Sequence, residues 1–330
     1  MTVREREARV TGRNGAPRSV TGHALVPNGN GRAGAARVAG KPGGVPVPAG
    51  PHDWGLFGPG SVSWKVHRSP VLLVGGLRAL IIQSLHPLAM AGVAQHSGYL
   101  ERPLRRLQRT AQYVATVVFG DTGSAERSAA MVRRVHSRVK GTDPITGRPY
   151  SAEDPETMVW VHCVEIHSFL AAYRAYGGRL TDAEQDAYLA EQVRAARLLG
   201  IPREIVPSSR AGYRAYFERM RPGLCVSEAA RNAIELCVDP PLKRELLPHQ
   251  ATLRMMGAAA VAITPGHIVR LAGLERRRPV YAAARVGTVA TGKVTSLPGL
   301  DRLGGSLVGG RTLTLPRAAI AAARAFGLER

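Results

Sequence analysis

Apolar residues recur at helical spacing along most of this chain. The clearest stretch lies between Pro70 and His96, where apolar positions follow the three- and four-residue steps of a helix. Its apolar residues are Leu72, Leu73, Leu77, Leu80, Ile81, Leu85 and Leu88. Pro70 suits the first turn, and the internal Pro87 should kink the helix because it lacks an amide donor. The pattern therefore predicts a long helix, bent at Pro87.

Start and stop residues divide the rest of the chain into further helices. Gly120 and Gly141 should end helices over about 103–119 and 124–139. Asp154-Pro155-Glu156 should cap a helix that reaches Tyr176, and Thr181 to Glu184 forms a capping box for a helix ending at Gly200. More helices are expected over about 208–220, 227–237, 240–263, 279–290 and 316–326. Because no segment predicts a strand, we expect an all-α fold.

The order of these segments predicts one large helical domain with two flanking parts. No linker interrupts the middle of the 330 residues, and a hydrophobic content of 45% can supply a substantial core. Residues 1–50 are rich in Arg, Gly and Pro and are predicted to be a disordered basic tail. We place the domain at 51–275, and a helical extension with a glycine-rich connector at 276–330.

The net charge of +21 is carried mainly by arginine, since only five of the 45 basic residues are lysines. Such charge would suit a polyanion or weak association with an anionic membrane surface. However, the arginines are spread over every predicted helix and are not clustered with stacking aromatics, and no zinc-finger or RNP motif is present. We therefore predict no specific nucleic-acid partner.

Cysteine usage and the N-terminal composition favour a cytoplasmic protein. The three cysteines, Cys163, Cys225 and Cys237, form no C-x-x-C pair and are too few for a disulfide framework. The N-terminal segment has no apolar run of the length that a secretory signal needs. Arg78, Gln83 and His86 interrupt the apolar run from 71 to 93, which indicates a buried or interfacial helix.

The candidate chemistry centres on His162, which follows Trp160-Val161 inside the apolar helix that starts at Asp154. His167 is five residues away and so lies on a different face of the helix, and H-E-x-x-H and the Glu-x-x-His pairs of di-iron bundles are absent. Cys163 is adjacent to His162 and points about 100° away, and no G-x-S-x-G elbow occurs. Zinc, di-iron and nucleophilic hydrolase sites therefore have little support.

A single imidazole between apolar helices suits two roles. It can be an axial haem ligand, or it can be a hydrogen-bonded core residue, which is the more common case. A haem site would also need cations for the propionates and polar groups on the distal face. The third predicted helix and the loop after it supply candidates for both: Arg133, Arg134, Arg138, His136 and Thr142.

A set of motifs, in order along the chain, resembles the MpaB/rubber oxygenase family, which includes the latex-clearing proteins. The resemblance covers roughly residues 52–275. The motifs are Trp64-Lys-Val-His67-Arg68, Leu85-His86-Pro87, Gly92-Val-Ala-Gln-His96-Ser97, Val118-Phe-Gly-Asp121, Val135-His-Ser-Arg-Val-Lys-Gly-Thr142, Gly147-Arg-Pro-Tyr-Ser-Ala-Glu-Asp-Pro155 and Trp160-Val-His162.

This resemblance implies a globin-like helical core that holds b-type haem and uses dioxygen on a hydrophobic small molecule, as in oxidative cleavage of isoprenoid double bonds. His162 matches the proximal ligand of the haem iron, and Arg138 and Thr142 match distal residues. His136 is a further pocket candidate, and Arg134 a candidate for the haem propionates.

One position departs from the rubber-cleaving pattern. Where those enzymes carry a distal lysine just before the threonine, this chain has Gly141, with Lys140 one residue earlier. Two alternatives to an oxygenase therefore stay open. The first is a peroxidase-like or dehydrating haem enzyme with the same ligand, and the second is a non-catalytic helical protein that binds a lipid or an anionic partner.

Overall fold

The computed structural model describes residues 52–240, 250–275, 281, 283–284, 310–325 and 327. The predicted tail at 1–50, the glycine-rich connector and most of the helix predicted over 279–290 lie outside this range. Within it the protein is mostly helical, which confirms the predicted all-α fold class.

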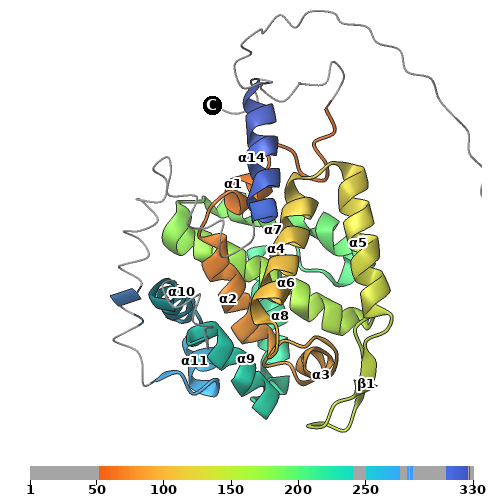
Figure 1. The fold of residues 1–330 in the computed structure, drawn as a ribbon, viewed down its shortest axis with the longest axis vertical. Helices are drawn as coiled ribbons and strands as arrows, with labels where there is room; N and C mark the ends of the chain where they lie inside the picture. The colour runs from red at the N-terminus through yellow and green to blue at the C-terminus, as the bar shows by residue number, and fades with distance from the viewer. Residues whose placement is uncertain are drawn as a thin grey trace, which may run out of the picture. The chain divides into compact units, whose positions relative to one another are not determined.

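The elements follow one another along the chain as short and medium helices with a single described hairpin (Figure 1). The first half contains α1 (Val62–His67), α2 (Leu72–Gln83), α3 (Pro87–His96), α4 (Pro103–Phe119), α5 (Thr122–His136), β1 (Lys140–Thr142) and β2 (Pro149–Ser151). The second half contains α6 (Pro155–Ala172) with a π-helical turn (Tyr173–Gly177), α7 (Asp182–Leu198), α8 (Arg210–Met220), α9 (Glu228–Val238), α10 (Gln250–Ala262), α11 (Gly266–Leu271) and α14 (Gly310–Ala325). Short 3₁₀ turns lie at Arg203–Ile205 and Arg221–Gly223.

The pairing of α2 with α6 forms the centre of the core (Figure 1). The two helices approach closely because α2 carries Gly75, whose missing Cβ would lie 3.0 Å from the Phe169 ring. Arg78 is buried in this interface, where its guanidinium donates to the Ser168 hydroxyl and the Ile263 carbonyl. α7, α8, α9 and α10 add buried apolar residues to the same cluster. The buried α6 therefore has neighbours on several sides, which explains why its sequence shows no polar face.

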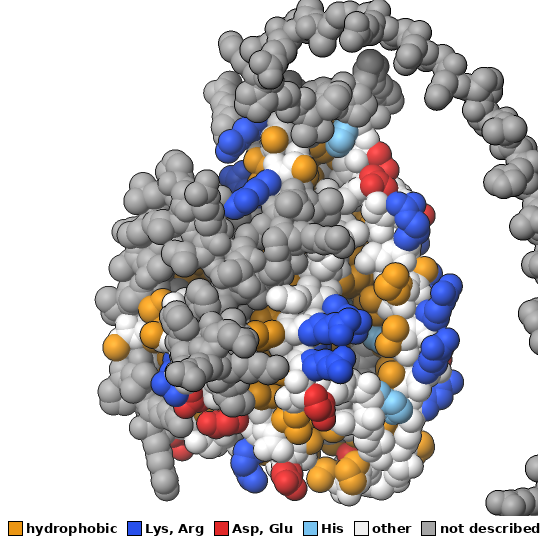
Figure 2. All heavy atoms as spheres, viewed as in Figure 1, with side chains coloured by type: hydrophobic (Ala, Val, Ile, Leu, Met, Phe, Trp, Pro, Cys, Tyr) orange, Lys and Arg blue, Asp and Glu red, His pale blue; other side chains and the backbone are white. Residues whose placement is uncertain are grey.

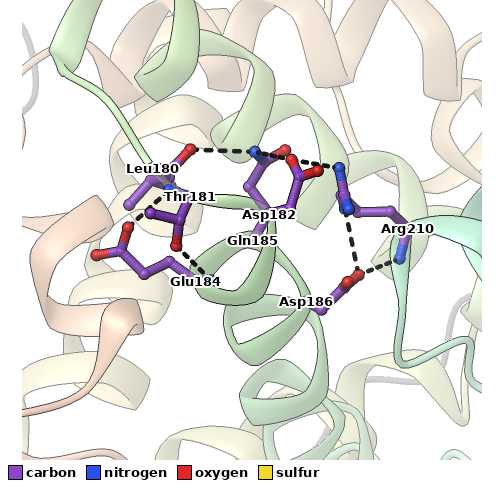
Figure 3. Close-up of polar contacts among 7 residues, drawn as sticks. All are labelled: Leu180, Thr181, Asp182, Glu184, Gln185, Asp186 and Arg210. Carbon is purple, nitrogen blue, oxygen red and sulfur yellow. Dashed lines mark hydrogen bonds and ion pairs between the residues drawn. The ribbon is translucent and has the colours of Figure 1, made fainter.

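Capping residues set the ends of α6 and α7 as predicted. The Asp154 side chain accepts from the amide of Thr157, and Pro155 occupies the first turn. At α7 the Thr181 hydroxyl accepts from the Glu184 amide, while the Glu184 carboxylate accepts from the Thr181 amide (Figure 3). Arg210 at the start of α8 then pairs with Asp182 and Asp186 of α7, which ties the two helices together.

The chain turns much more sharply at Pro87 than a kinked helix would. The axes of α2 and α3 differ by 105°, and three residues separate the helices. The break is stabilised because His86 becomes the N-cap of α3, where its Nδ1 accepts from the Ala89 amide. No single described helix is long and apolar enough to cross a membrane. α2 and α3 together have the length and apolar composition of a membrane span, but they are bent by 105°.

The prediction that the chain has no strand is wrong between α5 and α6. Lys140–Thr142 pairs antiparallel with Pro149–Ser151, and Gly141 lies opposite Tyr150. Asp143 stabilises the turn between them because its carboxylate accepts from Thr146 and from the Ile145 amide. Strands of three residues carry too little alternation to be seen in a sequence pattern. Two short helices, α1 and α11, were missed for the same reason.

Candidate functional site

His162 lies in the buried middle of α6. It is 6% exposed, and its Nε2 has no hydrogen-bond partner among the described residues. Burial lowers the pKa of this imidazole from 6.5 to about 4, so the ring is neutral at physiological pH. A neutral imidazole with a free nitrogen is the form that binds a metal. The unpaired Nε2 distinguishes His162 from a core histidine that uses both ring nitrogens in hydrogen bonds.

A cavity of about 1280 Å³ runs beside the same helix, between α2, α4 and α6. Along α6 it is lined by Val161, Glu165 and Phe169, which recur at four-residue steps and so form one stripe. Val161 is 37% exposed although it belongs to a core helix, because its side chain faces this cavity. His162 does not line the cavity. Helix geometry places it at the edge of the stripe, about 100° from Val161 and about 60° from Glu165.

Glu165 is an ionisable side chain in this apolar wall. Its carboxyl makes no hydrogen bond or ion pair to any described residue, and desolvation raises its pKa from 4.5 to about 7. The negative charge of Glu165 in turn helps to raise the pKa of Tyr113 on α4. A carboxyl group poised near neutral pH can accept or release a proton, which marks Glu165 as a candidate acid–base group.

His67 is a second buried histidine with an unpaired nitrogen, and it does line the cavity. It comes from the short helix α1, and its Nε2 is 3.0 Å from the Tyr188 hydroxyl of α7. Its Nδ1 has no partner among the described residues, and burial lowers its pKa to about 3. This residue is therefore the natural comparison for His162.

Three predicted site residues lie on the surface of the α5–hairpin region. Arg134, Arg138 and Thr142 are exposed, and none of their side chains makes a hydrogen bond or ion pair to a described residue. Arg133 donates to the Leu198 carbonyl at the end of α7. No hydrogen bond or ion pair in the described part of the chain links any of these residues to His162, so their distal and propionate roles stay predictions.

His136 has an intermediate position. It is half-buried at the end of α5, and its Nδ1 lacks a partner among the described residues. Its pKa is lowered by desolvation, an effect that Glu153 partly opposes. The ring is thus largely neutral near pH 7, which agrees with a pocket role without establishing one.

Gly141 packs against side chains where a longer residue would not fit. A Cβ at this position would lie 2.7 Å from the Tyr150 hydroxyl and 2.9 Å from Oε1 of Gln95. Those two groups are joined by a 2.7 Å hydrogen bond, and His96 Nε2 lies 3.1 Å from the same hydroxyl. The space that a side chain at position 141 would need is therefore filled by Tyr150 and Gln95. His96 ends α3, and its Nε2 also lies 3.2 Å from the Lys140 carbonyl of the hairpin.

His162 satisfies the first requirement of a haem ligand, since it offers a buried, neutral imidazole with an unpaired Nε2. The described residues form no cluster of three or more His, Cys, Asp or Glu side chains that could hold a metal ion. A metal bound at His162 would therefore need most of its ligands from a cofactor, as the porphyrin of haem supplies. His162 fits the proximal side of that group through its neutral imidazole and unpaired Nε2, and it lies beside the cavity rather than in its lining.

The cavity and its polar residues were not predicted from the sequence. Glu165 carries no local signal in the sequence, because its raised pKa depends on how α2 and α4 pack around it. His67 belongs to one of the resemblance motifs but lies on a six-residue helix with no visible periodicity. Its place in a motif of the family was the one available signal.

Comparison with known proteins supports the resemblance seen in the motifs. The chain matches the model of the ER-bound oxygenase mpaB/B'/Rubber oxygenase catalytic domain over residues 64–292. Searches of curated proteins and of solved structures gave no significant match. The matched range begins at the third residue of α1 and extends beyond α11, so it includes His162, the hairpin and most of the residues that line the cavity. The chain thus belongs to the family of ER-bound oxygenase mpaB and rubber oxygenase, through the catalytic domain of that family.

Proposed function

We propose that this protein is a haem-b-dependent oxygenase that uses dioxygen to oxidise a hydrophobic small molecule. The family of the catalytic domain indicates an oxygenase. The observation that carries the haem assignment is the unpaired Nε2 of His162, held neutral in the buried centre of α6.

In this proposal His162 holds the iron, and the haem supplies the redox chemistry with dioxygen when bound. α6 fixes the imidazole because its capped start at Asp154 and its close packing on α2 leave the helix little freedom to rotate. The lowered pKa keeps a proton from competing for Nε2 at any pH above about 5.

The cavity is the proposed place of the substrate. Its wall is formed mainly by apolar residues of α2, α4 and α6, so burial of a hydrophobic molecule there would be favourable at about 25 cal/mol per Å² of apolar surface removed from water. Glu165 would hold or accept a proton at its carboxyl, which is the chain's best-placed acid–base group in that wall. Arg138 and Thr142 are proposed as distal polar residues on the strength of their motif alone.

The test is haem binding by the purified full-length protein expressed with ample haem supply. We expect a Soret band in the wild type and its complete loss in His162→Ala. The matched control is His67→Ala, which removes the other buried histidine with an unpaired nitrogen and should keep the band. Thermal unfolding of all three proteins would show whether each variant is folded.

Three results would contradict the proposal. A colourless wild-type protein would favour the non-catalytic binding protein. Loss of the band in His67→Ala with retention in His162→Ala would move the iron ligand to α1. Turnover of model substrates with hydrogen peroxide but not with dioxygen would favour the peroxidase-like alternative.

A further inference from the structure

The cavity between α2, α4 and α6 has a charge pattern that an apolar substrate alone does not explain. Its lining includes seven basic side chains and two acidic ones. The basic residues are Lys65, Arg68, Arg102, Arg105, Arg106, Arg317 and Arg324, and the acidic ones are Glu101 and Glu165. Lys65 is neutralised by an ion pair with Glu184. Arg102, Arg105 and Arg106, at the start of α4, make no ion pair to a described residue, so positive charge gathers at this part of a mainly apolar space.

Arg106 is the most informative of these residues. Its side chain is half-buried, and desolvation lowers its pKa. No described residue forms a hydrogen bond or ion pair with its guanidinium. The ionisable groups that affect its pKa are the side chains of Cys237 and Tyr99, and both are uncharged at physiological pH. Desolvating a permanent cation without an anionic partner is costly, so the site is incomplete as it stands.

The position of Arg106 along α4 places this cation at one part of the cavity and Glu165 at another. Arg106 lies in the first turn of α4, whereas Tyr113, the α4 residue that interacts with Glu165, lies seven residues later. Seven residues of helix span about 10 Å. Leu107, Thr110 and Ala111 line the cavity between them, and Val114 lines it just beyond Tyr113. In Figure 2, basic side chains lie among apolar ones over the region where Figure 1 draws α4.

From these observations we infer that the cavity binds an elongated apolar molecule that ends in an anionic group, a carboxylate or a phosphate, and that Arg106 binds this end group. The apolar part would lie along α4 towards Glu165 and the stripe of α6. Binding of the end group would then determine which atom of the ligand lies next to α6, so Arg106 is a specificity-determining residue. The inference rests on the proposed function only in treating this ligand as the substrate.

Binding can be measured without haem or turnover, so its failure is separate from failure of the proposed function. We would titrate the purified full-length protein by calorimetry with dodecanoate, dodecyl phosphate and uncharged dodecanol. The wild type should bind at least one of the two anions about tenfold more tightly than dodecanol, since a charge-assisted hydrogen bond in a desolvated site is strong. The ratio between the two anions identifies a carboxylate or a phosphate as the preferred end group.

Variants on α4 give the decisive comparison. Arg106→Met keeps the length of the side chain but removes its charge, and should abolish most of the preference for the anions. Arg109→Met is the matched control, because Arg109 is exposed on the same helix and does not line the cavity. Ala111→Phe should weaken binding of all three ligands by filling the cavity, provided that thermal unfolding shows a folded protein.

Equal affinity of the wild type for dodecanol and both anions would overturn the inference. So would an unchanged preference in Arg106→Met. A third overturning result is loss of the Soret band in Arg106→Met with unchanged binding of the anions, which would assign Arg106 to the haem propionates.

Discussion

The candidate residues of this protein lie in two regions with opposite surroundings. On α6, His162 and Glu165 are enclosed by other helices. Burial lowers the pKa of His162 and raises that of Glu165, so the uncharged form of each is favoured. In the α5–hairpin region, Arg134, Arg138 and Thr142 are exposed and unpaired within the described chain. In the first region burial shifts the pKa values of ionisable groups, which costs stability. In the second region the side chains make no hydrogen bond or ion pair to a described residue, so they contribute little to stability. Mutations in the two regions should therefore separate stability from chemistry.

The largest expected effect is that of Arg138→Ala on turnover. If Arg138 acts at the distal face, as its motif implies, its removal should lower the turnover number about 100-fold, the usual effect of losing a donor that stabilises developing charge. Because the side chain is exposed and unpaired, the Soret band and the melting temperature should stay unchanged. Arg127→Ala is the control, because Arg127 is an exposed arginine of the preceding helix, α5. Unaltered turnover in Arg138→Ala would show that Arg138 takes no part in the reaction and that the buried region alone carries it out.

Glu165 should make the stability of the protein depend on pH. Its pKa is about 7 in the folded state and near the ordinary 4.5 when unfolded. Between these values the folded state keeps a proton that the unfolded state has lost, so the free energy of unfolding falls as the pH rises from about 4.5 to 7. We expect a loss of roughly 2 kcal/mol at pH 8 relative to pH 5, allowing for partial exposure to the cavity.

Glu165→Gln removes the ionisable group while keeping its shape. Its unfolding free energy, measured with urea, should lack this component of the pH dependence and exceed that of the wild type at pH 8. Identical pH profiles for the two proteins would show that water in the cavity solvates the carboxylate.

Gly141→Ala should weaken the hairpin by about 1 to 2 kcal/mol, because the new methyl group would displace the Tyr150 hydroxyl from Gln95. Gly76→Ala is the control, since a Cβ on Gly76 meets no atom within 4 Å and alanine favours a helix. The control should be neutral or slightly stabilising in urea unfolding. Equal effects of the two substitutions would mean that the hairpin yields easily to added volume.

The smallest expected effect comes from Thr181→Ala at the start of α7. Loss of the capping box should cost about 1 kcal/mol of stability. Since Thr181 belongs to neither candidate region, haem content and turnover should not change once folded protein is compared at equal concentration. A change in either would show that stability alone affects the site, and would weaken every comparison above.

The sequence was sufficient to predict the longer helices, although not α1 and α11, because the ends of those longer helices depend on local groups. Asp154 and Thr181 cap their helices through contacts within three residues, which a pattern reveals directly. The same holds for the break at Pro87, although its 105° size also depends on packing. His162 could be selected from its depth in an apolar helix together with the family motifs.

The cavity could not be predicted because residues far apart in the sequence create it. Glu165 is an ordinary helical glutamate until α2 and α4 exclude water from it, and Arg106 is one arginine among many until α4 turns it towards Tyr99 and Cys237. Such effects come from tertiary packing, which local patterns do not encode.

The packing around Gly141 also constrains how this protein can evolve. Because Tyr150 and Gln95 occupy the space beside position 141, a mutation from glycine to lysine would be harmful if it came first. A lysine there requires that the Tyr150 and Gln95 side chains shift, or that a smaller residue replaces one of them. Residues 95, 141 and 150 are therefore expected to change together rather than one at a time.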